Sequence, residues 1–267
     1  MKRRSGIAPT AVVWLLVGGA YFLIPLVATF LYSLKSNQTG NCCTAHNYGV
    51  IVHDGQFWAT LETSFILALE TIAISVALFV PTVYWVHLKL PRLRPVIGFL
   101  ALIPFVVPPI VLAVGLLDLY RGSPSWFYDT PKGFLVSGYV ILAFPYMYFS
   151  LDAGFRAIDL HTLTDAAHSL GAGWRTTLGR VILPNIRVAA LSGAFLTLAI
   201  VMGEFTIASL AAFNTFPTYI EYVEETQAYP AAALTLLSFG LTWAAMISLY
   251  FVGRGRLRGL GQVAGAR

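Results

Sequence analysis

Apolar residues fall into six long stretches along the chain, separated by short polar segments. A helix needs about 20 residues to cross the hydrocarbon core of a bilayer, and each stretch reaches or approaches that length. The pattern therefore predicts an all-α polytopic membrane protein with six transmembrane helices. The predicted helices cover residues 9–34, 60–88, 96–120, 134–155, 186–212 and 231–253. Three tracts contain no Asp, Glu, Lys or Arg, which is rare in a soluble core helix: 95–117, 133–151 and 226–253.

The composition also indicates a membrane protein. Apolar residues make up 57% of the 267 residues and charged residues 11%, against roughly 25% charged in soluble domains. The start Lys2-Arg3-Arg4 fits a signal peptide, but the apolar stretch that follows is too long and lacks a convincing small-residue cleavage site before Tyr32, so we expect a retained span. We expect a single transmembrane domain over 1–267, with its core in 60–253.

Basic residues alternate between the two sides that the predicted helices define. Fourteen of the 17 Lys and Arg residues fall on one side, and the other three are Lys35, Arg121 and Lys132. Because cytoplasmic loops carry the excess of basic residues, both termini and the segment 165–184 are expected in the cytoplasm. The sequence has no basic patch with interleaved aromatic residues, so we expect no nucleic-acid partner.

The polar segment 165–184, DAAHSLGAGWRTTLGRVILP, carries a distinctive spacing. It follows Glu-Ala-Ala, three residues, Gly, nine residues, Ile, one residue, Leu-Pro, with Asp in place of Glu and Val in place of Ile. The matching positions are Asp165, Ala166, Ala167, Gly171, Val181, Leu183 and Pro184. This spacing resembles the cytoplasmic coupling loop of permease subunits of binding-protein-dependent ABC importers. An ordinary amphipathic loop helix between two spans is the alternative interpretation.

Local signals predict the shape of this loop, which we place at 156–185. Asp159 is expected to cap a short helix, and Gly171 to end it in a left-handed conformation. Gly173 then turns the chain into Trp174, where a second short helix begins. The first helix should carry an apolar stripe, shallow enough at its alanines for close docking: Leu160, Leu163, Ala166, Ala167 and Leu170. The resemblance implies that the loop enters a groove of an ATP-binding subunit through Asp165, Ala166, Ala167, Leu170, Gly171, Gly173, Val181, Leu183 and Pro184.

No enzymatic activity is expected of this chain. The sequence contains no Gly-rich phosphate loop ending in Gly-Lys-Ser/Thr. His161 and His168 are seven residues apart, and no carboxylate or Cys completes a catalytic triad or a metal-binding set with them. We therefore expect no cofactor and no metal, with ATP bound by partner subunits.

The resemblance implies a type I ABC importer transmembrane fold in the inner (plasma) membrane and a set of partners. These are a second permease, identical or different, two ATP-binding subunits and an extracytoplasmic binding protein, all assembled in the lipid bilayer. A secondary transporter and a non-transporting membrane scaffold are the alternatives. The first usually needs more helices or an internal repeat, and the second has no use for a docking loop.

Glu204 is the residue most directly suggestive of a substrate pathway. It lies among apolar residues in the predicted fifth helix, where a carboxylate is costly unless it meets water, a partner or a substrate. With Phe205 and Phe213 nearby it suits a cation, and the stretch GEFTIASLAAFNTFP resembles permeases of the spermidine/putrescine branch. A structural hydrogen bond to the sister subunit is the alternative role. Phosphonate, sulfate, ferric iron, thiamine or a sugar are the alternative substrates.

Cys42 and Cys43 are adjacent in the first loop on the outward side, beside His46 and His53. The spacing matches no usual zinc pattern. A strained disulfide and two free thiols are both compatible with the sequence.

Overall fold

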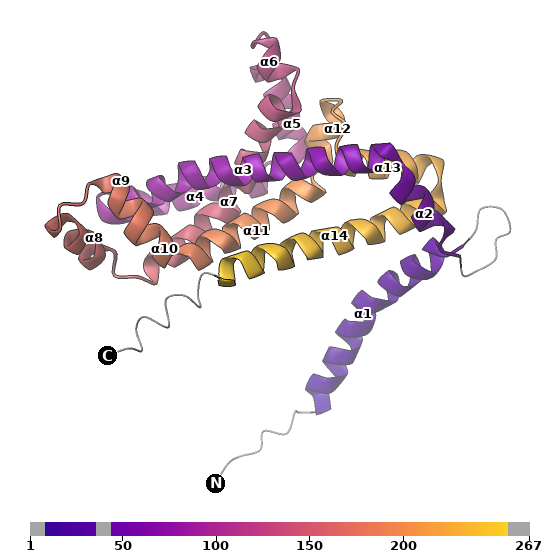
Figure 1. Cartoon of the computed structure of the whole chain (residues 1–267), viewed down its shortest axis with the longest axis horizontal. Helices are drawn as coiled ribbons and strands as arrows, with labels where there is room; N and C mark the ends of the chain where they lie inside the picture. Colours follow the sequence, from indigo (N-terminus) through magenta and orange to yellow (C-terminus); the bar gives the residue numbers. More distant parts are fainter. Residues whose placement is uncertain (1–8, 36–43, 256–267) are drawn as a thin grey trace. The chain divides into compact units, whose positions relative to one another are not determined.

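The computed structural model describes residues 9–35 and 44–255, and these residues form helices and no strands. Cys42 and Cys43 lie outside the described residues. Four described helices are long and apolar enough to cross a membrane by themselves (Figure 1): α1 (Pro9–Ser33), α3 (Gly55–Leu88), α7 (Pro131–Arg156) and α14 (Ala228–Gly255). They correspond to the first, second, fourth and sixth helices expected from the sequence.

The third expected helix is broken near its middle. The short 3-10 turn η1 (Pro91–Leu93) and α4 (Arg94–Val106) form its first part, and α5 (Pro109–Leu119) forms the second part at an angle of 101°. Val107 and Pro108 are extended at the break, with ψ angles of 118° and 140°. Two consecutive prolines cannot donate backbone hydrogen bonds, so the α4 ladder cannot continue through them.

The fifth expected helix, 186–212, is also discontinuous. Its first part is α11 (Arg187–Gly203), which follows Trp174–Asn185 after a bend of 79°. If each bent pair counts as one span, the described residues contain up to six spans. Glu204 then adopts an extended conformation, and the five-residue helix α12 (Thr206–Leu210) follows. The expectation that Glu204 sits inside a continuous helix is therefore wrong, because α11 ends one residue before it.

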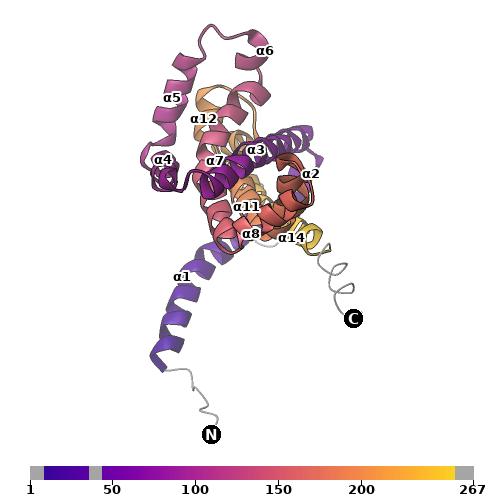
Figure 2. The same cartoon turned by 90° about the vertical axis from the view of Figure 1, so that its left-hand side faces the viewer.

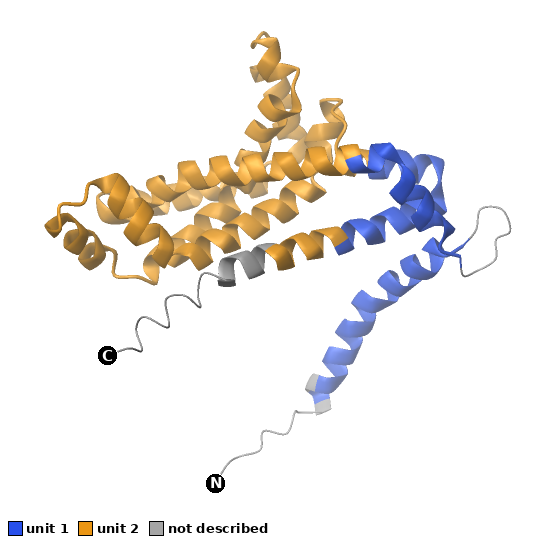
Figure 3. Ribbon diagram, in the orientation of Figure 1, with its two compact units in different colours: residues 1–58, 220–240 blue, residues 59–219, 241–267 orange. Residues whose placement is uncertain are grey.

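The chain divides into two compact units, which Figure 3 colours separately. Unit 1 comprises residues 1–58 and 220–240. It includes α1, the short helix α2 (His46–His53), most of α13 (Phe216–Thr226) and the first half of α14. Here Asn47 donates through Nδ2 to the carbonyl oxygens of Ser33 and Lys35, at 2.7 and 2.8 Å, and the rings of Tyr32 and Tyr229 lie 4.8 Å apart.

Unit 2 comprises residues 59–219 and 241–267 and contains the predicted loop and Glu204. In Figures 1 and 2, α3, α7 and α11 run side by side, and α8 (Leu160–Ser169) lies near one end of them. We call this the α8 end of unit 2. Helix α5 packs beside α12 and the first part of α7, and α6 (Ser125–Tyr128) lies next to the start of α7.

Helix α7 is the centre of unit 2. A Cβ built on Gly193 of α11 would lie 2.7 Å from Met147 Sδ, and a Cβ built on Gly154 of α7 would overlap the Ala189 side chain. These glycines let the two helices approach closely, as small residues do in membrane helix pairs. One buried cluster surrounds α7 near α12, and a second lies at the α8 end.

Candidate functional site

The ends of α8 form as the local sequence predicts. Asp159 Oδ1 accepts a hydrogen bond from the Thr162 backbone N–H at 3.2 Å, and Thr162 Oγ1 donates to Oδ2 at 2.8 Å. These two hydrogen bonds, the hydroxyl one first, lower the pKa of Asp159. At the other end, Gly171 has a φ of +79° and the Ala172 N–H donates to the Ala167 carbonyl at 3.0 Å. Both features fix the length of the helix before any partner binds.

The apolar residues expected to form one stripe on α8 lie on two faces of the helix, one buried and one exposed. Leu160, Thr164 and Ala167 are buried, recur at helical spacing and face the chain's own core. Ala166 and Leu170 are exposed, and Leu170 exposes 89% of its side chain. The expectation that all five apolar positions face a partner is therefore wrong, because Leu160 and Ala167 are needed inside.

The second half of the loop leads into α11 through irregular helix. Residues Trp174–Thr176 form α9, Thr177–Ile182 form the π-helix η2, and Leu183–Asn185 form α10. The Trp174 ring lies 6.4 Å from Trp85 of α3, and the Arg175 guanidinium lies 5.3 Å from the Trp174 ring. Ile182 is fully buried in the cluster at the α8 end. The loop is thus anchored on α3 and α7 by apolar contacts.

The nine expected coupling residues separate into two groups. Ala167, Val181 and Leu183 are buried or half-buried and pack inside unit 2. The other six are exposed and available to a partner: Asp165, Ala166, Leu170, Gly171, Gly173 and Pro184. The sequence spacing alone could not separate these groups, since both follow the same motif.

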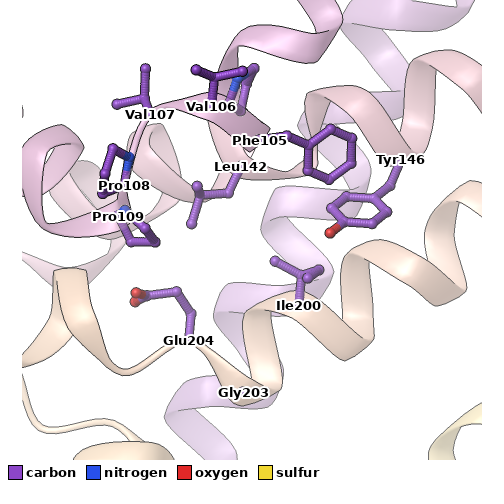
Figure 4. A pocket seen from close by; sticks show the side chains of 11 residues that line it. Phe105, Val106, Val107, Pro108, Pro109, Leu142, Tyr146, Ile200, Gly203 and Glu204 are labelled. Atoms are coloured by element: carbon purple, nitrogen blue, oxygen red, sulfur yellow. The ribbon is translucent and has the colours of Figure 1, made fainter.

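Glu204 lies at a pocket of about 390 Å³ beside the break between α4 and α5. Its side chain points towards Pro108 and Pro109, and it is 8% exposed (Figure 4). Oε1 accepts the Ile207 N–H at 2.9 Å and so caps α12. Oε2 is buried and accepts no hydrogen bond of normal geometry among the described residues, although the buried Tyr139 side chain interacts with this carboxylate. A buried carboxylate oxygen without a partner is costly, so the pocket offers a place for a donor or a cation.

The aromatic residues near Glu204 differ from those expected. Phe105 of α4 and Tyr146 of α7 line the pocket with their rings 5.3 Å apart and nearly perpendicular. Phe205 and Phe213 are not among the lining residues, and the Phe213 ring packs 6.0 Å from Phe134 in the core. Neither Phe105 nor Tyr146 carried a sequence signal. The adjacent Pro108 and Pro109 are a local signal that could have located the helix break beside this pocket, since proline cannot donate a backbone hydrogen bond.

Comparison with known proteins identifies the family of this chain. Residues 88–258 match the family described as binding-protein-dependent transport system inner membrane component. This match covers more than half of the chain and includes both α8 and Glu204. The chain therefore belongs to that family and is a permease subunit of an ABC importer, with several helices in the membrane.

Individual relatives share less than a third of their aligned residues with this chain. A probable molybdenum ABC transporter permease of Haloferax volcanii is 29% identical over 197 residues, which cover 71% of this chain and 68% of the relative. The spermidine/putrescine transport system permease PotC of Escherichia coli K12 is 22% identical over 205 residues, covering 75% and 74%. These relatives differ in the substrate that their names give.

Solved structures show the same fold. A bacterial alginate ABC transporter superposes with a TM-score of 0.62 at 14% identity, covering 94% of this chain and 92% of that one. The MetNI methionine ABC transporter superposes with a TM-score of 0.55 at 17% identity, covering 81% and 98%. The expected type I importer fold is therefore confirmed.

Proposed function

We propose that the exposed face of the α8 loop docks on a separate ATP-hydrolysing subunit. The observation that carries this proposal is Leu170, an 89% exposed leucine at the end of a helix whose other face is buried. Burial of a large leucine side chain against a partner is favourable, because it removes apolar surface from water. The α8 loop belongs to the segments that hold 14 of the 17 basic residues, which supports a cytoplasmic position for the α8 end. A second permease and an extracytoplasmic binding protein complete the proposed importer.

A pair of substitutions on α8 tests this docking. Leu170→Glu places a charge in the proposed contact, whereas His161→Glu places the same charge nine residues away, half a turn round the helix, at a position that is also exposed. Purified complexes would be assayed for ATP turnover with and without loaded binding protein. We expect stimulated turnover to fall about tenfold or more for Leu170→Glu and to persist for His161→Glu. Equal stimulation in both variants would contradict docking at Leu170.

We further propose that the transported solute is a small organic cation of the polyamine type. The eleven residues that line the Glu204 pocket include one carboxylate, two aromatic rings and no basic side chain. Carboxylates and ring faces both favour positive charge once water is partly removed. The unpartnered Glu204 Oε2 is the observation that carries this proposal.

Molybdenum transport is the second candidate, because the Haloferax relative carries that name and shares 29% identity. An oxyanion such as molybdate would need positive charge or several hydrogen-bond donors, whereas the lining side chains supply no positive charge and one hydroxyl, that of Tyr146. The charge of the pocket therefore favours the cation.

Uptake assays with two probes decide between the candidates. Proteoliposomes containing the complex would be given radiolabelled spermidine or molybdate, each with the cognate binding protein. Glu204→Gln keeps an oxygen to accept the Ile207 N–H but removes the charge, so we expect spermidine uptake to fall about tenfold or more with unchanged thermal stability. Glu62→Gln, an exposed carboxylate on α3, is the matched control. Molybdate uptake by the wild type, or wild-type spermidine uptake by Glu204→Gln, would refute the cation proposal.

A further inference from the structure

We propose that Asp152 is a positioning residue of the transport cycle. It ties the start of α4 to α7 at the α8 end of unit 2, so that α4 and the pocket at its far end follow the movement of α8. This inference rests on the proposed docking of α8.

Three helices meet at the Asp152 carboxylate. Oδ1 lies 2.8 Å from His87 Nε2 of α3 and accepts a hydrogen bond from Arg94 Nε of α4, also at 2.8 Å. Oδ2 pairs with Arg156 of its own helix and accepts from Arg94 Nη2 at 3.4 Å. The Tyr148 hydroxyl adds a second contact between α7 and α4, donating to the Arg94 carbonyl at 3.2 Å. Arg94 therefore holds α4 on α7 at its first residue.

The Asp152 carboxylate is much more buried than the two arginines that pair with it. The Asp152 residue is 5% exposed, whereas the Arg94 and Arg156 side chains are 34% and 56% exposed. A carboxylate at such burial needs charged or hydrogen-bonding partners, and Arg94 supplies two bonds from a planar group. Loss of the bond to α4 would leave α4 attached to α7 through Tyr148 and apolar contacts.

The same cluster reaches the α8 loop. The Phe155 ring stacks at 5.6 Å on His87, and Phe155 belongs to one buried cluster with Leu160 of α8 and Ile182 of η2. A displacement of α8 therefore acts on the helix ends that carry the Asp152 contacts.

Helix α4 connects the Asp152–Arg94 contact to the Glu204 pocket. Its 13 residues span about 20 Å, and its end supplies Pro104, Phe105 and Val106 to the pocket lining. The other side of the pocket includes Gly203 and Glu204, at the end of α11, and α11 begins directly after the α8 loop. One side of the pocket is thus joined to the loop by continuous chain and the other through Asp152.

Two arginines give a matched pair of variants. Arg94→Gln breaks the contact between α4 and α7, whereas Arg156→Gln removes the same charge from the same carboxylate but only within α7. Asp152→Asn tests the carboxylate itself, and Asp129→Asn, at an exposed position after α6, is its control. All variants would be purified in the complete importer complex.

Two readouts separate positioning from simple stability. The first is the ratio of ATP turnover with and without spermidine-loaded binding protein. The second is the distance between spin labels at Leu100 of α4 and Val188 of α11, both exposed, measured with and without ATP and vanadate in a chain whose Cys42 and Cys43 are serines. Thermal stability of the complex is recorded alongside.

For Arg94→Gln and Asp152→Asn we expect the stimulation ratio to fall about 2- to 30-fold and the label distance to broaden with nucleotide. The wild type, Arg156→Gln and Asp129→Asn should keep one narrow distance distribution and an unchanged ratio. Equal behaviour of Arg94→Gln and Arg156→Gln, or loss of thermal stability in Arg94→Gln with an unchanged ratio, would overturn the proposal.

Leu170→Glu in the same assays distinguishes this inference from the docking proposal. If Leu170→Glu uncouples turnover and Arg94→Gln leaves the ratio and the distance unchanged, docking stands and the Asp152 tie is wrong. In the opposite outcome, Leu170→Glu keeps stimulated ATP turnover, whereas Arg94→Gln lowers the stimulation ratio and broadens the spin-label distance distribution. The positioning role of Asp152 then stands and docking at Leu170 is wrong.

Discussion

At the residue scale, three acidic side chains of unit 2 have roles that their neighbours define. Asp159 is exposed and caps α8, Asp152 is buried against basic groups of three helices, and Glu204 caps α12 with one oxygen while the other faces a pocket. The same functional group therefore starts a helix, joins helices or lines a pocket. The local hydrogen bonds decide which of these it does.

Replacement of Asp159 by Ala should loosen α8 without unfolding the chain. The cap hydrogen bond to Thr162 is lost, so backbone amide exchange in the first turn of α8 should become about fivefold faster. Hydrogen exchange of the purified complex measures this, and Asp165→Ala, at an exposed position within α8, should leave the first turn unchanged.

The pH dependence of this cap has a definite sign. Because hydrogen bonding lowers the pKa of Asp159, its contribution is complete above the ordinary Asp pKa and is lost only as the pH falls through the lowered value. Protection of α8, corrected for intrinsic exchange, should thus be constant between about pH 6 and pH 8. A decline in this range would show that another group controls the start of α8.

At the element scale, unit 2 combines tightly packed straight helices with helices that break. Helices α7 and α11 approach closely at Gly154 and Gly193, and α4 and α11 end where the pocket begins. Breaks in membrane helices are tolerated where the freed backbone groups find other partners or line a cavity. The pocket thus forms from helix ends, while the packed helices hold those ends in place.

Replacement of Gly193 by Ala should destabilise the chain. The new Cβ would lie 2.7 Å from Met147 Sδ and 3.2 Å from Met147 Cα, and overpacking of this kind costs about 1–3 kcal/mol in the free energy of unfolding. Gly115→Ala is the control, because a Cβ there meets no atom within 4 Å. Denaturant titration of the purified subunit compares the two. A Gly193→Ala variant as stable as Gly115→Ala would show that α7 and α11 separate easily.

At the scale of the whole molecule, the arrangement of charge along the chain predicts orientation in the membrane. The segments expected in the cytoplasm hold 14 of the 17 basic residues, and they include the α8 loop that is proposed to meet an ATP-hydrolysing subunit. The segments on the opposite side include the end of α13. Orientation therefore links the docking proposal to the side on which ATP is available.

Cysteine labelling tests this orientation. In a chain whose Cys42 and Cys43 are serines, a cysteine at Ser169 of α8 should resist an impermeant thiol reagent added outside intact cells, whereas one at Gln227 should react. Both positions are exposed within their units, so accessibility in the membrane decides the outcome. A third position, Gln262, should also resist the reagent, and it lies outside the described residues. Labelling of position 169 from outside would reverse the orientation and exclude docking on a cytoplasmic ATPase.

The class of fold and the limits of α8 could be predicted from the amino-acid sequence. Long uncharged apolar stretches leave few alternatives to membrane helices, because backbone polar groups in lipid must be satisfied within the helix. Asp159 and Gly171 act on neighbours within a few residues, so their effects follow from local spacing. The break at Pro108 and Pro109 was not predicted, because the apolar stretch 96–120 is long enough for one continuous span, and its angle of 101° comes from the structure.

Which side chains are exposed and which are paired could not be predicted, because this depends on helix packing. Ala167 and Leu170 belong to the same motif, yet Ala167 is buried and Leu170 is exposed, because burial depends on what packs on each face of the helix. Asp152 meets Arg94 and His87 from 58 and 65 residues away in sequence. The pocket of Glu204 gathers α4, α7 and the end of α11 for the same reason: contacts between distant segments arise from helix packing, which apolar periodicity does not specify.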